Sequence, residues 1–134
     1  MDAKESRAGM GPQTIKDCLE RAAAECPDAV VLAYKRGGRW RNTTYGALRE
    51  RAWHVAEMLA ELGVRPGDRV ALYRENSPEW FELYHGIVGI GAVAVPIDTK
   101  LREQEVAHIL HDCGVCAVFC SAPLCEGVLG LDRK

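Results

Sequence analysis

From Pro66 to Phe119 the sequence alternates apolar segments that favour strands with segments that favour helices. The pattern predicts strands at 69–73, 92–95 and 115–119, with helices at 80–90 and 102–112 between them. Because the connections are short, this order is typical of a parallel βαβαβ unit with right-handed crossovers. The fold class is therefore predicted to be α/β.

The sequence before this unit predicts a helix and a β-hairpin. Thr14 and Asp17 have the spacing of a capping box, which places the start of a helix just after Thr14. Segments at 29–34 and 39–43 favour strands and flank a Gly-Gly pair, so we expect them to form a hairpin. We therefore expect an N-terminal hairpin and helices to precede the parallel α/β unit.

Two further helix starts are marked by hydroxyl residues. Ser77 followed by Pro78 predicts the start of the helix at 80–90, which is apolar almost all round and should be largely buried. Another helix is predicted from Thr44 to a glycine cap at Gly63. Its apolar residues lie along one stripe, which consists of Tyr45, Leu48, Ala52, Val55, Leu59 and Leu62.

A length of 134 residues is typical of one domain. We expect residues 1–13, which are small and polar, to form a flexible tail, and residues 14–134 to form the domain. After a turn at Pro123, a further helical stripe begins with Leu124, Val128 and Leu131. No strand follows that stripe, so the α/β unit is predicted to be truncated.

The composition is that of an ordinary globular protein, with 48% hydrophobic and 27% charged residues. A formal net charge of −2 gives no general attraction to nucleic acid or to an anionic membrane. No apolar stretch approaches the roughly 20 residues of a transmembrane helix, and residues 1–12 lack the apolar core of a signal peptide. The six cysteines are therefore expected to be reduced thiols in the cytoplasm.

Gly86, Gly89 and Gly91 invite comparison with a nucleotide-binding loop. That loop needs the order G-x-G-x-x-G between a strand and the helix that follows it. Here the order is G-x-x-G-x-G, and the glycines close a helix that leads into a strand. We therefore expect them to serve close packing between helix and sheet.

The densest group of chemically reactive side chains consists of His108, His111, Cys113, Cys116 and Cys120. Thiolates and imidazoles suit zinc, so a zinc or redox site is one hypothesis for this group. A structural zinc site usually takes a second ligand pair from elsewhere in the chain, and the remaining cysteines form no such pair. The competing interpretation is that Cys116 and Cys120 pack in a buried strand.

The other polar candidates point to no complete active site. His54 lies beside the apolar stripe of its helix and is expected to be a packed or surface histidine. His85 is interpreted in the same way, because it has no acidic or nucleophilic neighbour at catalytic spacing. Arg36, Arg39 and Arg41 form a small basic patch around the hairpin, which we interpret as a solvated face. No catalytic, cofactor-binding or metal-binding residue is assigned.

Five motifs between residues 14 and 121 resemble, in their order, the N-terminal part of the adenylate-forming (AMP-binding) enzymes, and long-chain fatty acid–CoA ligases in particular. The first four are Thr44-Tyr45, Gly67-Asp68-Arg69-Val70-Ala71, Asn76-Ser77-Pro78-Glu79-Trp80 and Gly91-Ala92-Val93-Ala94-Val95-Pro96-Ile97. The fifth consists of Leu101, Glu105, His108-Ile109-Leu110 and Asp112. The resemblance covers nearly the whole chain, and the motifs occupy scaffold positions such as turns and helix starts.

The resemblance implies an ATP-dependent ligase that joins a carboxylate to coenzyme A through an acyl-adenylate, with magnesium on the phosphates. The family's phosphate loop, magnesium motif, ribose-binding Asp and catalytic Lys have no matching positions in this sequence. Lys134 matches none of them. The chain alone is therefore predicted to be inactive and to bind no cofactor, whereas ATP, magnesium and coenzyme A are expected for the full-length enzyme.

Three functional hypotheses remain at this point. The first is an N-terminal fragment of an acyl-CoA synthetase, whose open sheet edge is covered by the rest of the polypeptide. The second is a complete, non-catalytic interaction module that pairs with a related protein or with itself through that edge. The third is a small zinc or redox protein that uses the segment Cys113–Cys120.

Overall fold

The computed structural model describes residues 14–131, so the tail predicted at 1–13 lies outside the described residues. The elements follow in the order α1 (Ile15–Glu25), β1 (Val30–Arg36), β2 (Arg39–Thr44), α2 (Tyr45–Glu61), β3 (Arg69–Tyr73), α3 (Pro78–Gly89), β4 (Val93–Pro96), α4 (Glu103–Cys113), β5 (Ala117–Cys120) and α5 (Ala122–Leu131). The predicted α/β fold is confirmed, with one antiparallel hairpin and one parallel sheet.

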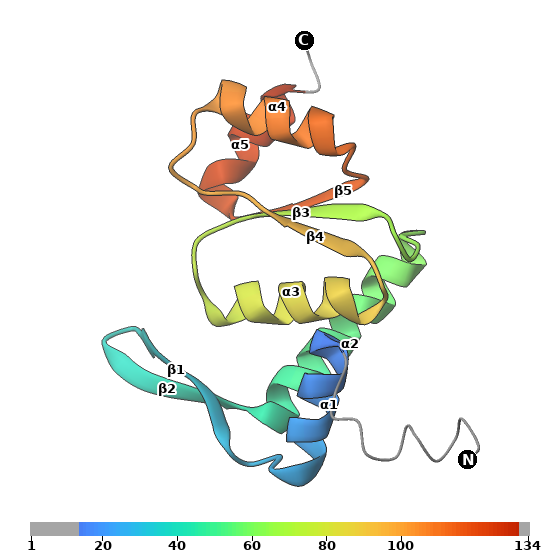
Figure 1. Cartoon of the computed structure of the whole chain (residues 1–134). Coiled ribbons are helices and arrows are strands. Elements are labelled where there is room, and N and C mark those ends of the chain that lie inside the picture. Colours follow the sequence, from blue (N-terminus) through green and yellow to red (C-terminus); the bar gives the residue numbers. More distant parts are fainter. Residues whose placement is uncertain (1–13, 132–134) are drawn as a thin grey trace, which may run out of the picture.

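The parallel sheet has the strand order β4-β3-β5 and lies between two helical layers. Figure 1 shows α3 on one face, backed by α2 and α1, and shows α4 and α5 on the other face. Central strand β3 alternates between the layers. Val70 packs with Leu59 and Ile87 on the α3 side, whereas Ala71 and Tyr73 pack with Val106 on the α4 side. This alternation follows from the period of two along a strand.

The predicted helix starts are confirmed. Thr14 and Asp17 form the reciprocal capping box of α1, with both hydrogen bonds at 3.1 Å. The Ser77 hydroxyl accepts a hydrogen bond from the Trp80 amide, and Thr44 caps α2 in the same way through the Ala47 amide. Side-chain oxygens thus satisfy amides that a helix N-terminus leaves unpaired.

Four details of the sequence prediction are wrong. Leu62 does not join the buried stripe of α2, because it lies at the C-cap and is 70% exposed. Cys116 is exposed and precedes β5, so it is not in a buried strand. Pro123 lies within the first turn of α5, where its missing N–H costs nothing. Helix α3 is not largely buried: most of its residues are only half-buried, and Phe81 is exposed.

Gly86 packs helix against helix, whereas the sequence predicted packing against the sheet. A Cβ atom at this position would lie 2.4 Å from Cγ1 of Val55 in α2. Only a residue without a side chain lets α2 and α3 approach so closely. Figure 1 shows α2 lying against α3.

Candidate functional site

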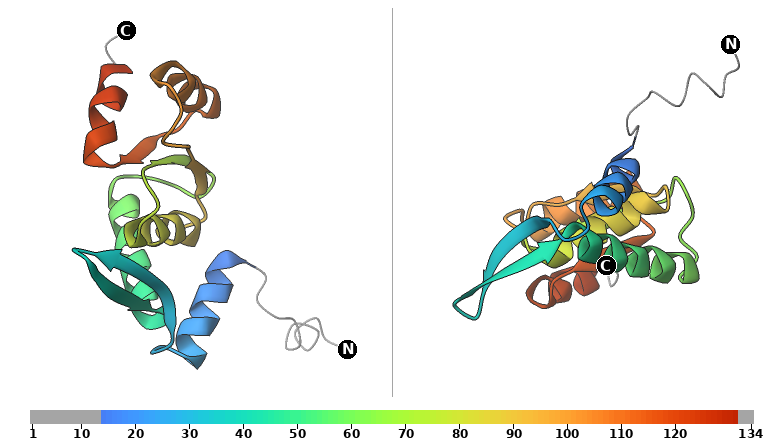
Figure 2. Two further views of the ribbon diagram at one scale, coloured as in Figure 1. Left: turned by 90° about the vertical axis from the view of Figure 1, so that its left-hand side faces the viewer. Right: turned by 90° about the horizontal axis from the view of Figure 1, so that it is seen from below.

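The carboxyl ends of β3 and β4 form the place in this fold best suited to a ligand. The two strands are parallel neighbours, but α3 then covers one face of the sheet and α4 covers the other (Figures 1 and 2). The loops that leave the strands therefore diverge, and such switch points are where open α/β sheets bind ligands. A crevice of about 450 Å³ lies there, lined by Arg74, Glu75, Asn76, Trp80, Pro96, Ile97, Asp98, Thr99 and Lys100.

Local turns fix both walls of this switch-point crevice. On the β3 side, the cap formed by Ser77 ends the loop and starts α3. On the β4 side, the Asp98 carboxylate accepts a hydrogen bond of 2.9 Å from the Lys100 amide, and the Asp98 carbonyl accepts one from Leu101. Asp commonly forms turns of this kind with the backbone just ahead of it. The crevice walls are thus held by residues of the loops themselves.

Arg74 is the cation best placed to bind a ligand in the crevice. Its side chain is largely covered, and its Nε is buried without a hydrogen-bond partner. One Nη lies 4.0 Å from a carboxylate oxygen of Glu79, whose other oxygen accepts a 2.6 Å hydrogen bond from Arg36 of the hairpin. A buried N–H without a partner is costly, so an acceptor placed here would be favourable.

Two carboxylates near Arg74 are held in the charged form. Burial works to raise the pKa of Glu79, but hydrogen bonds from Arg36 and from the backbone outweigh it and lower that pKa overall. A hydrogen bond from its own backbone amide lowers the pKa of Glu75. The lining contains neither histidine nor cysteine, and it offers charged side chains of both signs. The arrangement suits binding of a polar group.

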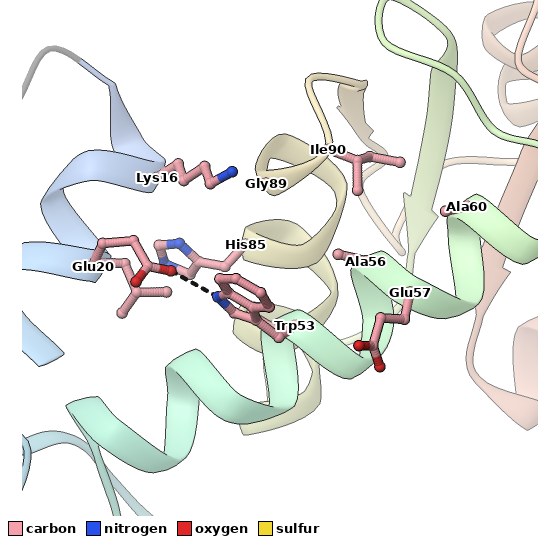
Figure 3. Close-up of a pocket in the computed structure, with 11 residues that line it drawn as sticks. Lys16, Glu20, Trp53, Ala56, Glu57, Ala60, His85, Gly89 and Ile90 are labelled. Carbon is pink, nitrogen blue, oxygen red and sulfur yellow. Dashed lines mark hydrogen bonds between the residues drawn. The ribbon is translucent and has the colours of Figure 1, made fainter.

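A second cavity, of about 300 Å³, lies between α1, α2 and α3 (Figure 3). Its walls are largely apolar, and the Trp53 indole donates a 2.7 Å hydrogen bond to the Glu20 carboxylate across it. His85 contributes from α3, and Glu57 from α2. Sequence spacing gave His85 no acidic neighbour, whereas the fold brings two carboxylates from other helices to the same cavity.

The burial of its ring nevertheless agrees with the interpretation of His85 as a packed residue. Burial lowers the pKa of its imidazole, which keeps the ring neutral near pH 7. Its Nδ1 is buried and has no hydrogen-bond partner. His54, by contrast, is exposed on α2.

The cysteine–histidine group does not assemble into a metal site. Residues 14–131 contain no group of three or more His, Cys, Asp or Glu side chains placed to hold a metal ion. His108, His111 and Cys116 are exposed, whereas Cys113 and Cys120 are half-buried, and all of these cysteines are free thiols. The zinc hypothesis thus has no support from the geometry. Burial raises the pKa of the Cys120 thiol, which therefore stays protonated.

Sequence reasoning missed the switch-point crevice because its two walls come from separate parts of the chain, around residues 74–80 and 96–100. The motifs containing Asn76 and Ile97 were assigned scaffold roles only. The available signal was the polar residues that directly follow two successive parallel strands. Adjacent strand ends meet at one edge of a sheet, and this rule could have paired Arg74 with Lys100.

Comparisons with known proteins agree with one another. The family described as AMP-binding enzyme matches residues 19–133. The chain is 45% identical over 80 residues to long-chain-fatty-acid–CoA ligase FadD13 of Mycobacterium tuberculosis, which is 60% of this chain and 16% of that protein. It is 33% identical over 114 residues to a crotonobetaine/carnitine–CoA ligase of Salmonella typhimurium, covering 84% of this chain and 22% of that ligase.

Solved structures show the same relationship. The inhibitor-bound N-terminal domain of FACL13 from Mycobacterium tuberculosis superposes with a TM-score of 0.81 at 35% identity, over 90% of this chain and 30% of that one. The anthranilate CoA ligase AuaEII gives a TM-score of 0.80 at 27% identity, over 99% of this chain and 24% of that one. The chain thus spans less than a quarter of the length of these curated relatives.

Proposed function

We propose, since the chain belongs to the AMP-binding enzyme family, that it forms the N-terminal part of an ATP-dependent acyl-CoA synthetase. The observation that supports this most directly is the superposition on the N-terminal domain of FACL13, which uses 90% of this chain but only 30% of that domain. A synthetase therefore needs much more polypeptide than these 134 residues.

The proposed reaction has two steps. A carboxylate oxygen attacks the α-phosphate of ATP, which gives an acyl-adenylate and releases pyrophosphate. The thiol of coenzyme A then attacks the acyl carbon, and AMP leaves as the thioester forms. Fatty acids are the proposed acyl substrates, because a ligase of long-chain fatty acids is among the chain's relatives. The setting is proposed to be the cytoplasm.

This chain contributes scaffold and binding surface to that reaction. The switch-point crevice offers Arg74 and Lys100 to an anionic or polar part of a substrate. We propose that magnesium, like ATP and coenzyme A, is held by residues of the remaining polypeptide. The adenylation and thioester steps therefore depend on residues of the remaining polypeptide.

The remaining polypeptide is also the proposed partner of the sheet. Within residues 14–131, β4 and β5 each pair only with β3, so the outer edge of each strand is open. Open edges of this kind attract further strands. The same open edges would also suit a second candidate, a non-catalytic interaction module that pairs with a related protein or with itself.

The mass of the endogenous polypeptide that carries this sequence separates the two candidates. A mass several times 14.8 kDa, with fatty-acid-dependent exchange of pyrophosphate into ATP, supports the synthetase. The 134-residue chain alone should show no exchange. A 14.8 kDa endogenous protein would contradict the synthetase and favour the module. Exchange catalysed by the short chain would contradict its dependence on the remainder.

Arg74→Gln in the full polypeptide tests the crevice. We expect a rate of pyrophosphate exchange lowered roughly tenfold, because an anion would lose a charge-assisted hydrogen bond. Arg65→Gln is the matched control, since Arg65 is exposed at a turn outside the crevice. Equal rates in the two variants would contradict a role of Arg74 and the crevice in binding substrate.

A further inference from the structure

Two cysteines lie at the turn that joins β5 to α5. Cys120 is the last residue of β5, and α5 begins two residues later at Ala122. The amides of Leu124 and Cys125 both donate hydrogen bonds of 3.0 Å to the Ser121 carbonyl. Ser121 is therefore the N-cap of α5, Cys120 is the residue before the cap, and Cys125 is the fourth residue of the helix. Figure 2 shows the chain turning from β5 directly into α5.

These two positions bring their side chains together. The residue before an N-cap commonly packs against the fourth residue of the helix, an arrangement known as the hydrophobic staple. In this staple both residues are cysteines, and the Cys120 thiol donates a hydrogen bond to the Cys125 sulfur. A disulfide can form only where two side chains point toward each other. The contact between these two thiols meets that requirement.

The pair can be reached from solvent. Both thiols are free and half-buried, so neither is sealed in the core. Helix α5 contains no buried residue, which leaves its first turn free to adjust when a reagent approaches. The exposed Cys26 thiol, by contrast, is held by the backbone, because it donates a hydrogen bond of 3.1 Å to the Ala22 carbonyl. Cys120 and Cys125 are thus two free thiols in contact at an accessible place.

Thiol–disulfide exchange is the chemistry that such a pair supports. Because burial and the neighbouring Cys125 sulfur raise the pKa of the Cys120 thiol, the first thiolate forms at Cys125. That thiolate attacks one sulfur of glutathione disulfide and releases one glutathione, which leaves a mixed disulfide on Cys125. The Cys120 sulfur then gives up its proton and attacks the Cys125 sulfur, which closes the intramolecular bond and releases a second glutathione. The pair loses two electrons and two protons, and the two glutathione molecules carry them.

We propose that Cys120 and Cys125 are a redox-active dithiol that small disulfides, such as glutathione disulfide, oxidise reversibly to an intramolecular disulfide. The bond restrains α5, which is the one helix within residues 14–131 that has no buried residue. Sequence spacing gave no sign of this pair, because residues five apart are not neighbours on a continuous helix. The proposal rests on the contact between the two thiols and is independent of the synthetase reaction.

Controlled oxidation of the 134-residue chain tests the proposal. The reduced chain is equilibrated at constant glutathione with increasing glutathione disulfide, and the remaining thiols are alkylated with iodoacetamide. Chymotrypsin cleaves after Phe119, so mass spectrometry separates the pair Cys120 and Cys125 from the pair Cys113 and Cys116. We expect the first pair to form its disulfide at a roughly tenfold lower concentration of glutathione disulfide than the second pair needs.

Two results of this titration would overturn the proposal. One is full alkylation of Cys120 and Cys125 at every concentration of glutathione disulfide, which would leave the two cysteines as small apolar residues that only pack in the staple. The other is oxidation of the pair Cys113 and Cys116 at the same or a lower concentration. Either result would show that the contact at the start of α5 does not favour a disulfide.

Cysteine variants then test the order of the two steps. Cys120→Ser should stop the reaction at the mixed disulfide, so that Cys125 carries one glutathione. Cys113→Ser together with Cys116→Ser is the matched control, and it should form the disulfide at the same concentration as the parent chain. A Cys125 that stays free of glutathione in Cys120→Ser would overturn the proposal, since attack by this thiol is its first step. Loss of the disulfide in the control would overturn it as well.

Amide hydrogen exchange measures what the bond does to the helix. Oxidation should slow the exchange of α5 amides several-fold in the parent chain, because the bond opposes local unfolding of the helix start. The α1 amides should be unchanged, and Cys120→Ser should show no slowing. Equal exchange of α5 in the reduced and oxidised parent would contradict the restraint. Circular dichroism of each variant must match the parent, and the titration of the parent needs no variant if one of them unfolds.

Discussion

The helices on the two faces of the parallel sheet differ in how completely their side chains are buried. On the α3 face, Leu59, Val70 and Ile87 are completely buried, and a second layer of helices backs α3. On the α4 face, helix α5 has no buried residue at all, and Leu129 is 63% exposed. Figure 2 shows no further layer beyond α4 and α5 within the described residues.

This difference indicates where the chain can fold by itself and where it needs more polypeptide. The α3 face closes its core with elements that precede and follow β3 in this sequence. The α4 face leaves half-buried apolar residues such as Leu124 and Val128, which would gain from a further layer. The asymmetry agrees with the proposal that these residues form part of a larger enzyme.

Core truncation gives the largest expected effect and tests the comparison directly. Leu59→Ala should destabilise the chain by about 2–5 kcal/mol, because it removes a completely buried side chain. Leu124→Ala should cost less than half as much, since that side chain is only half-buried. Urea unfolding monitored by circular dichroism measures both free energies. Equal losses would show that the α4 face is as well packed as the α3 face.

Gly86→Ala tests the contact between α2 and α3. We expect a loss of about 1–3 kcal/mol, because the new methyl group overlaps the Val55 side chain. Gly89→Ala is the matched control in the same helix, where nothing lies within 4 Å of an added Cβ. The control should be neutral or slightly stabilising, since Ala is the better helix former. If the midpoint of thermal unfolding of Gly86→Ala matched that of the parent chain, the close approach of α2 and α3 would be contradicted.

Acidification should weaken the same layer through His85. Its lowered pKa means that the unfolded chain binds a proton more readily than the folded chain. The contribution of His85 to the free energy of unfolding is therefore fully present above the unfolded pKa of about 6.5. It falls as the pH drops from there toward the folded pKa. Urea midpoints measured between pH 5 and pH 8 should show this slope. His85→Gln should flatten it, and the exposed control His54→Gln should not.

The ion pair between hairpin and α3 gives the smallest expected effect. Glu79→Gln removes the acceptor of Arg36, but the pair is partly exposed and contributes little to stability. Because the pKa of Glu79 is lowered, its contribution is present above the unfolded pKa of about 4.3 and is lost as the pH falls through the folded pKa. The amide exchange of β1 should rise selectively in Glu79→Gln. Unchanged exchange would show that the hairpin is held by its backbone alone.

Sequence reasoning predicted the strand β3 over its observed range, and it predicted the helix starts at Thr14, Thr44 and Ser77. These features depend on interactions within a few residues, such as caps, turns and apolar periodicity. The strand β5 begins two residues later than expected, because its start is set by pairing with β3. The candidate site itself was not predicted, since its lining comes from two loops and no motif records their meeting.

The sequence by itself determined the α/β class, the family resemblance and the order of elements, because each of these follows from local propensity and motif order. Tertiary structure alone decided that Gly86 faces Val55 and that Glu79 joins Arg36 to Arg74. Such outcomes depend on how distant segments pack. Packing is settled by shape and burial across the whole chain, which no local pattern specifies.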